Sequence, residues 1–186
     1  EINFREVSFN VVSILTGTGY VTNDFSKWGQ FPLIYFLILM FIGGCAGSTA
    51  CGIKIFRVQI LYQFISNQLK RIIYPRGIFN IKYDKNNVDE KFMASIISFI
   101  FLYILIFFVI TALLSVDGLD FITAISAAAT SISNVGPGLG DVIGPNGNFS
   151  YLSNFSKWIL SIGMILGRLE LFAVLVLFIP SFWRKY

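Results

Sequence analysis

Uncharged hydrophobic runs of membrane-crossing length dominate the chain. Residues 92–116 contain no charged side chain, residues 30–51 begin strongly apolar and then become rich in glycine, and residues 158–183 are apolar apart from Arg168 and Glu170. A bilayer core about 30 Å thick needs roughly 20 apolar residues of helix. The pattern therefore predicts three membrane crossings. The first should be interrupted, because the sequence GGCAGSTACG is a poor helix former.

Two shorter apolar segments, residues 4–16 and 119–133, cannot cross a bilayer. Each is followed by a glycine-containing stretch, TGTGY at 16–20 and SNVGPG at 133–138. Non-helical backbone is tolerated at membrane depth only where protein covers it or a water-filled cavity lies beside it. We therefore predict two re-entrant loops, each a half-length helix that enters from the outer face and returns as extended chain.

Charge asymmetry predicts the orientation of the chain. Residues 54–91 hold eight Lys or Arg and three Asp or Glu, whereas residues 1–29 and 117–157 hold fewer basic than acidic side chains. An excess of basic residues is typical of cytoplasmic loops. We therefore expect the linker 65–91 and the C-terminus in the cytoplasm and both glycine-containing loops outside. The chain begins at Glu1 rather than Met, and we treat it as part of a longer protein.

An internal repeat relates the two halves of the chain. A shift of 117 positions aligns Gly19 with Gly136, and a shift of 130 aligns FSKW at 25–28 with FSKW at 155–158. A helix C-terminus carries roughly half a negative elementary charge, and glycine can turn carbonyl oxygens toward an axis. The repeated unit therefore suits a cation path in which carbonyls replace water. An ordinary turn glycine is the alternative at both positions.

Composition narrows the possible functions. Only 13% of the residues are charged, against about 25% in soluble domains. The absence of histidine excludes His-based acid–base catalysis, Ser-His-Asp triads and His-ligated metal sites. Cys45 and Cys51 cannot supply a four-thiolate zinc site, and the net charge of +4 is too small for a nucleic-acid binder. We expect no enzyme activity, no covalent cofactor and no nucleic-acid partner.

Four sequences resemble the potassium uptake proteins of the Trk, Ktr and HKT superfamily, most closely the membrane subunit of bacterial Trk systems: VVSILTGTGY, GGCAGSTACGIK, SNVGPGLG and GRLELFAVLVLFIPSFWRK. The resemblance implies an all-α integral membrane protein built from tandem units of span, re-entrant pore loop and span. Residues 1–64 would then hold the pore loop and second span of a third unit. Residues 65–91 would form a basic cytoplasmic linker, and residues 92–186 a complete fourth unit.

The resemblance also implies a site. The filter glycines Gly19 and Gly136 would bind potassium through backbone carbonyls, and the glycine-rich stretch would form an intramembrane gate below them. In the second loop Asn134, Val135 and Pro137 replace the Gly, Thr and Tyr of the first, so we expect an asymmetric and less strict filter. The predicted ion-binding residues are Thr18, Gly19, Tyr20, Asn134, Val135 and Gly136, and the predicted gate residues are Gly43, Gly44, Gly47, Ser48, Thr49, Gly52 and Arg168.

Arg168 is an unusual charge, since it lies about 15 Å into its predicted span. A charge at that depth costs about 2.5 to 3.5 kcal/mol on insertion scales. We expect Arg168 to face the aqueous pathway or the carbonyls of the glycine-rich stretch. The alternative is that it ties two helices together through backbone carbonyls. Close helix packing is a further interpretation of glycines at four-residue spacing, namely Gly43 with Gly47 and Gly163 with Gly167.

Asp24 and Asp141 follow the two predicted filters and are aligned by the repeat. They could draw cations into an outer vestibule. Solvated or helix-capping carboxylates are the alternative for both.

The function expected from these features is potassium uptake across the bacterial inner membrane. Two pore loops cannot encircle an ion, so N-terminal repeat units of the same protein, or a second copy, must complete the ring. The resemblance also implies a homodimer and a cytosolic nucleotide-binding subunit of the Trk A type on the basic linker, although positive-inside bias alone would explain that charge. The alternative function is a secondary transporter of sodium or another cation with broken helices.

Overall fold

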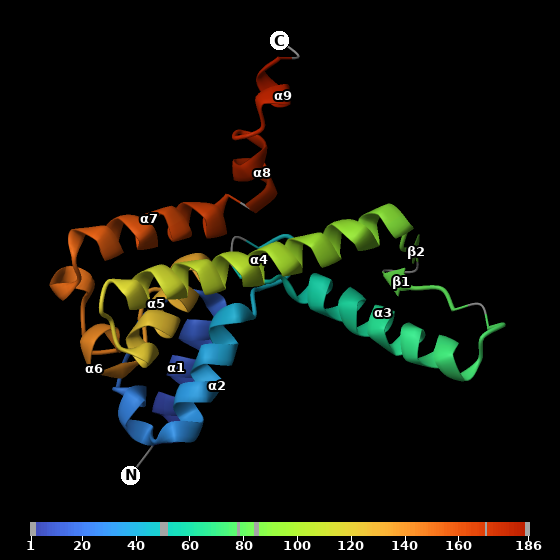
Figure 1. The fold of residues 1–186 in the computed structure, drawn as a ribbon. Coiled ribbons are helices and arrows are strands. Elements are labelled where there is room, and N and C mark those ends of the chain that lie inside the picture. The colour runs from blue at the N-terminus through green and yellow to red at the C-terminus, as the bar shows by residue number, and fades with distance from the viewer. Residues whose placement is uncertain (1–2, 49–51, 78, 84–85, 170, 185–186) are drawn as a thin grey trace.

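Helices make up nearly all of the regular structure in this computed structural model, which describes residues 3–48, 52–77, 79–83, 86–169 and 171–184 (Figure 1). Thr49 of the predicted gate, Cys51 and Glu170 lie outside the described residues. The elements in chain order are α1 (Phe4–Thr16), η1 (Phe25–Trp28), α2 (Gln30–Phe41), α3 (Ile55–Ile73), β1 (Lys82–Tyr83), β2 (Asn86–Asn87), α4 (Glu90–Val116), α5 (Phe121–Ser133), α6 (Gly140–Ile143), η2 (Phe149–Tyr151), α7 (Asn154–Arg168), α8 (Leu171–Val176) and α9 (Pro180–Trp183).

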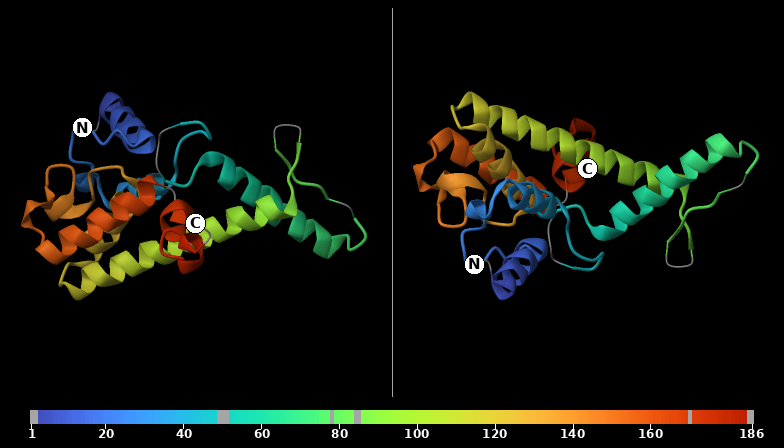
Figure 2. Two further views of the ribbon diagram at one scale, coloured as in Figure 1. Left: turned by 90° about the horizontal axis from the view of Figure 1, so that it is seen from above. Right: turned by 90° about the horizontal axis from the view of Figure 1, so that it is seen from below.

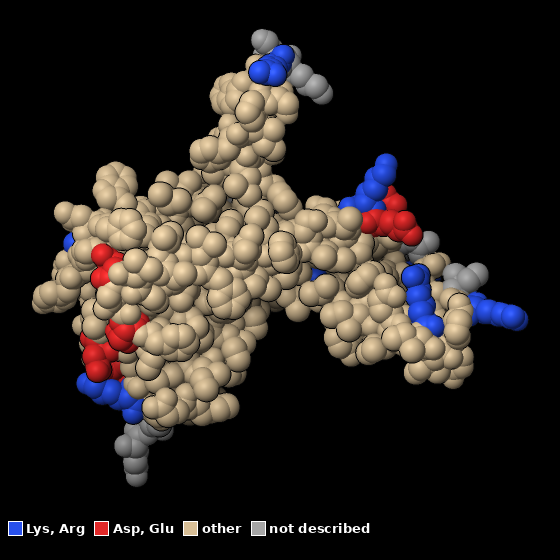
Figure 3. Space-filling view, in the orientation of Figure 1, with Lys and Arg blue, Asp and Glu red and all other residues tan. Residues whose placement is uncertain are grey.

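Helix α4 has the length and hydropathy expected of the clearest predicted crossing. Within the described part of the chain it is the one helix long and apolar enough to span a bilayer. Its 27 residues extend about 40 Å at 1.5 Å per residue. In this view, charged side chains gather at the two ends of the molecule along this helix and at the tip of the C-terminal segment, and a broad uncharged surface lies between them (Figure 3). The middle of the molecule is therefore matched to hydrocarbon rather than to water.

The other two predicted crossings are broken. Helix α2 ends at Phe41, and the next helix begins at Ile55, so the expected interruption at the glycine-rich stretch is present. The third crossing, expected as one span over 158–183, is corrected, because α7 ends at Arg168 and α8 turns sharply away from it (Figure 1). A second break separates α8 from α9, where Pro180 occupies the first helical position. Proline lacks the N–H that a continuing helix would need.

The linker contains a small exception to the expected all-α structure. Strands β1 and β2 pair antiparallel, with Lys82 opposite Asn87 and Tyr83 opposite Asn86. Helix α3 runs through the expected boundary at residue 65 without a break. It packs on α4, where the guanidinium carbon of Arg57 lies 3.8 Å from the centre of the Phe99 ring. This cation–π contact lets a charged group cover an apolar surface.

Helix α5 forms the centre of the molecule and packs against α2, α4 and α7. In both views of Figure 2, α1 and α4 lie on opposite sides of the molecule. Every residue of α5 from Ser126 to Ser133 is buried. Three consecutive alanines, Ala127 to Ala129, have no exposed surface. Such small side chains let neighbouring backbones approach closely, which is how helices associate where no water drives them together.

Two glycines of α7 lie directly against the C-terminal end of α5. A Cβ atom at Gly163 would overlap the Ser131 hydroxyl, and one at Gly167 would overlap the Ile132 carbonyl oxygen. Close packing therefore explains this glycine pair. The same interpretation fails for Gly43 and Gly47, because neither lies in a helix.

A carboxylate joins the end of α4 to the start of α7. Asp117, the C-cap residue of α4, accepts hydrogen bonds from the hydroxyls of Ser153 and Ser156, the latter at 2.6 Å. Ser153 is itself the N-cap of α7. These two hydrogen bonds, that of Ser153 first, hold the pKa of Asp117 below its ordinary value of 3.8.

Replacing Gly167 with alanine should destabilise the protein. The new methyl group meets a backbone oxygen that cannot rotate away, so α7 must shift from α5 at a cost of about 1–3 kcal/mol. Gly47→Ala is the matched control, because a Cβ there meets nothing within 4 Å. Thermal unfolding of the purified protein should show a lower melting temperature for Gly167→Ala alone. Equal melting temperatures for the two variants would contradict this packing.

The Asp117 contact should make stability sensitive to acid. A carboxylate whose folded pKa lies below 3.8 stabilises the fold fully above that pH and loses its contribution as pH falls through the folded value. The melting temperature should therefore fall more steeply between about pH 7 and about pH 3 for the wild type than for Asp117→Asn. Parallel profiles would show that the carboxylate does not hold the two helices together.

Candidate functional site

The short helices α1 and α5 end in the same turn, at the spacing of the internal repeat. Their C-cap residues, Gly17 and Asn134, both have left-handed backbones, with φ of 70° and 51°. The N–H of each cap donates to the carbonyl three residues back, at 3.1 Å in α1 and 3.2 Å in α5. The next N–H donates to the carbonyl five residues back, at 2.9 Å and 3.1 Å. The repeat inferred from weak sequence identity is therefore a repeat of backbone structure.

The two turns meet, although 117 residues separate them in the chain. A Cβ at Gly17 would lie 3.9 Å from the Asn134 carbonyl oxygen, and a Cβ at Gly136 would lie 3.7 Å from the Cα of Gly19. A Cβ at Gly19 would overlap the carbonyl oxygen of Val135. Gly19 and Gly136 have φ of 76° and 117°, which L side chains rarely adopt. The structure therefore brings together the two predicted filter glycines, and both need to be glycine.

The meeting point is electrostatically suited to a cation. The C-terminal ends of α1 and α5 both face it, and each carries roughly half a negative elementary charge. Neither helix has a basic residue in its last turn. At its other end, α5 is capped by Asp120, which accepts a hydrogen bond from the Thr123 N–H at 3.1 Å. Hydrogen bonding to Thr123 is also the main cause that lowers the pKa of Asp120.

Polar side chains of α1 hold the extended segment that follows it. The Ser13 hydroxyl donates to the Tyr20 carbonyl at 2.6 Å. The Asn10 amide donates to the Thr22 hydroxyl at 3.1 Å and accepts from the Thr22 N–H at 3.2 Å. Asn10 and Ser13 are both buried. The first predicted filter segment is thus attached to its own helix at two points.

Helix α5 holds its segment in the same manner with different groups. The Thr130 hydroxyl accepts from the Gly136 N–H at 2.9 Å. The Ser126 hydroxyl accepts from the Leu139 N–H at 3.1 Å and donates to the Leu139 carbonyl at 3.3 Å. The sequence reasoning missed these positioning side chains of both helices. Their signal was present as polar residues three or four positions apart, on one face of a short apolar helix.

The remaining predicted filter residues differ in where their side chains lie. Tyr20 is 72% exposed and Val135 is buried. The Thr18 hydroxyl lies 2.8 Å from that of Thr16. The Asn134 side chain points away from the place where the two turns meet, and its amide donates to the Met164 carbonyl of α7 at 3.0 Å. A cavity of about 370 Å³ opens beside the glycine pair, lined by Gly19, Tyr20, Val21, Gly136, Pro137 and the segments 143–145 and 147–149.

The predicted gate lies in a loop whose two ends, at residues 43–44 and 53–55, are joined by backbone hydrogen bonds. The Gly43 N–H donates to the Ile53 carbonyl at 2.9 Å, and the Ile55 N–H donates to the Gly44 carbonyl at 3.2 Å. Gly52 has a φ of 83°, and a Cβ there would lie 3.1 Å from the Phe41 carbonyl oxygen. Inside the loop, the Ser48 hydroxyl donates to the Cys45 carbonyl at 3.0 Å. Backbone hydrogen bonds therefore join the two described ends of the break after α2.

Arg168 lies in the last turn of α7 rather than in the middle of a continuous helix. A cation there is favoured by the carbonyl groups of the helix C-terminus. This interaction partly offsets the free-energy cost of placing a charge at membrane depth. Its neighbour Gly167 touches the Ile132 carbonyl of α5. The backbone of Arg168 therefore adjoins the C-terminal end of α5, and the residue is exposed.

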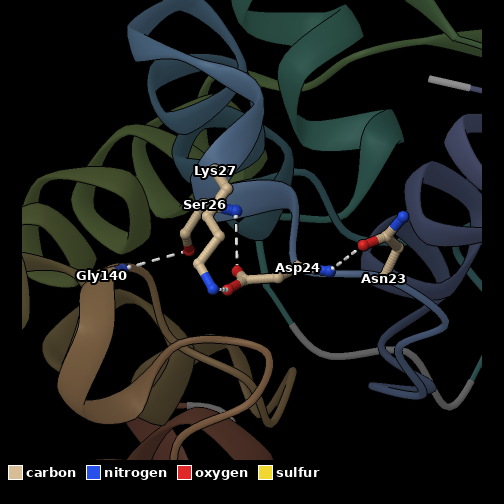
Figure 4. A network of polar contacts seen from close by, with 5 residues as sticks. All are labelled: Asn23, Asp24, Ser26, Lys27 and Gly140. Carbon is tan, nitrogen blue, oxygen red and sulfur yellow. Dashed lines mark hydrogen bonds and ion pairs between the residues drawn. The ribbon is translucent and has the colours of Figure 1, made fainter. Parts of the chain in front are cut away.

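Asp24 acts as a helix cap in this structure (Figure 4). Its carboxylate accepts from the Ser26 N–H at 3.2 Å and pairs with Lys27 at 3.3 Å. The Ser26 hydroxyl accepts from the Gly140 N–H at 3.3 Å, which links the two repeats. Asp141 follows Gly140 and is exposed in the first turn of α6. The vestibule role of the two carboxylates stays a prediction.

Known proteins match this chain along almost its full length. The family model described as TrkH, cation transport protein, matches residues 2–185. The chain is 45% identical over 98% of its length to the Trk system potassium uptake protein TrkI of Halomonas elongata, and 35% identical over 99% to TrkH of Escherichia coli. It covers 37% and 38% of those two proteins.

A solved structure gives the same result. The chain matches the crystal structure of the potassium transporter TrkH from Vibrio parahaemolyticus with a TM-score of 0.88 and 36% identity, over 97% of this chain and 38% of that one. From its sequence and its fold together, the chain belongs to the TrkH family of cation transport proteins.

Proposed function

We propose that this chain supplies half of a potassium-conducting filter in a bacterial membrane. The observation that carries the proposal is the meeting of two equivalent helix C-termini at Gly19 and Gly136. Peptide oxygens at this point replace the water around a potassium ion, so that its dehydration inside the bilayer costs less. No bond is made or broken, and the protein is a transporter rather than an enzyme. Its Trk system relatives, named as potassium uptake proteins, support the choice of ion.

The filter has unlike halves. The carbonyls of Asn134 and Val135 lie against the opposite segment at Gly17 and Gly19. Pro137 stands where the first loop has Tyr20, and Asn134 is tied to α7. An ion therefore meets different surroundings on its two sides, and discrimination between potassium and sodium is weaker than in a symmetric channel.

The ring needs further units. Two segments cannot surround an ion, and the curated relatives are more than twice as long as this chain. Additional repeat units of the same protein, or a second copy, supply the missing carbonyls. The excess of basic side chains in the linker 65–91 and of acidic ones near the filter segments supports an orientation with the linker in the cytoplasm and both filter segments outside (Figure 3). We place the C-terminus on the cytoplasmic side as well. A homodimer and a cytosolic nucleotide-binding subunit of the Trk A type are the proposed partners.

Gly19→Ala should strongly reduce potassium uptake. The new Cβ would overlap the Val135 carbonyl oxygen and force a left-handed backbone on alanine, so uptake should fall by about tenfold or more. Gly29→Ala is the matched control, since Gly29 also has a positive φ but a Cβ there meets nothing within 4 Å. The measurement is the initial rate of potassium uptake in cells that lack their own uptake systems. Normal uptake by Gly19→Ala would refute the filter.

The gate consists of the glycine-rich loop and Arg168. The loop sequence lacks bulky side chains, and backbone hydrogen bonds join its two ends. It is therefore suited to block a narrow path and to move out of it. Arg168 adds a positive charge that opposes a cation. Its place at the end of α7, one residue from a close contact with α5, supports a role near the base of the filter.

Arg168→Ala should raise the basal flux of potassium. A unit charge 4 Å from an ion opposes it by about 1 kcal/mol even in bulk water, so the leak should rise about fivefold or more. Arg168→Lys keeps the charge and should retain part of the closure. Potassium efflux from loaded vesicles measures both. Unchanged flux in both variants would remove Arg168 from the gate.

A further inference from the structure

Equivalent hydroxyls lie behind the two filter segments but bind them with opposite polarity. Ser13 and Thr130 are 117 residues apart, and they are 5% and 1% exposed. Ser13 donates to a carbonyl, that of Tyr20, at 2.6 Å. Thr130 instead accepts from an amide, that of Gly136, at 2.9 Å. The same place in the repeat thus fixes one peptide by its oxygen and the other by its nitrogen.

Peptide planarity converts this difference into carbonyl directions. In a trans peptide the C=O and N–H point to opposite sides, and the described residues contain no cis peptide. Thr130 holds the N–H between Val135 and Gly136 toward α5, so the Val135 carbonyl must point away from α5. That oxygen does lie against Gly19 of the opposite segment. Ser13 has the reverse effect, since it turns the Tyr20 carbonyl back toward α1.

We propose that Thr130 is a positioning residue that sets the preference for potassium over sodium by holding the Val135 carbonyl toward the ion. The inference rests on the proposed filter function and goes beyond it. Selection among alkali ions depends on the number of carbonyl oxygens and on how far they can follow a smaller ion. With its N–H anchored, the Val135 peptide cannot turn inward around sodium. Ser13 completes the arrangement, because it withdraws the Tyr20 oxygen from the path.

The hydroxyl of Thr130 cannot easily be replaced by water. Thr130 is 1% exposed, and every buried side-chain polar atom in the described part of the chain already has a hydrogen-bond partner. Thr130→Val keeps the shape and removes the acceptor, which leaves the Gly136 N–H without its partner. Thr130→Ser keeps the acceptor and removes only a methyl group. The two variants therefore separate hydrogen bonding from packing.

The test is the ratio of initial potassium and sodium uptake rates for the protein expressed from its complete reading frame. The ratio should fall about fivefold in Thr130→Val, as expected for one lost hydrogen bond, and stay within about twofold of the wild type in Thr130→Ser. Thr111→Val is the matched control, because the Thr111 hydroxyl donates to the Phe107 carbonyl of its own helix, away from both filter segments. Its ratio should be unchanged. Because the readout is a ratio, differences in protein amount cancel.

The outcomes separate this inference from the proposed function. A wild type that moves no potassium would refute the function itself. A selective wild type with the same ratio in Thr130→Val would overturn only the role of Thr130, as would an equal fall in Thr130→Ser or Thr111→Val. If Thr130→Val carries no ions at all, thermal unfolding of the purified protein in potassium or sodium chloride gives the answer. Loss of a potassium-specific rise in melting temperature supports the inference, and an unchanged rise overturns it.

Discussion

The constraint on which this structure depends is the need to satisfy extended backbone that lies deep inside a hydrophobic molecule. A helix pairs its own N–H and C=O groups, but the segments after α1 and α5 cannot. Each helix solves this with side chains of its own, Asn10 and Ser13 in one case and Ser126 and Thr130 in the other. In the proposed function, the peptide groups that these side chains leave unbound are the ones that would face an ion.

Close backbone contacts fix the position of the end of α5 and of the segment that follows it. Gly163 and Gly167 bring α7 against the end of α5, and the Ser131 hydroxyl donates to the Leu160 carbonyl at 2.9 Å. From the other side, the Tyr103 and Ser133 hydroxyls lie 2.7 Å apart and join α4 to α5. Lipid offers helices little hydrophobic incentive to associate, so small residues and side-chain hydrogen bonds do this work. These contacts act together with the buried apolar cluster that includes Ile14 of α1 and Val135 and Leu139 of the second segment.

The sequence predicted the features that depend on hydropathy and on glycine, and missed those that depend on three-dimensional register. Helix α4, the two short helices, the break after Phe41 and the pairing of Gly19 with Gly136 were all predicted. The end of α7 at Arg168 was not predicted, because hydropathy indicates whether a segment prefers lipid or water and does not indicate where a helix ends. The roles of Ser13 and Thr130 were also missed, since a serine or threonine can bond many partners and only the folded chain selects one.

One small difference between the repeats has a mechanical consequence. At the left-handed turn after α5 the chain carries Asn134, whose amide reaches the Met164 carbonyl of α7, whereas the matching turn after α1 has Gly17 and no side chain. A displacement of α7 along its axis would therefore pull on the segment after α5 and leave the segment after α1 in place. Movement of α7 would thus reach the segment after α5 through the single Asn134 side-chain amide, while the segment after α1 has no such connection at its turn.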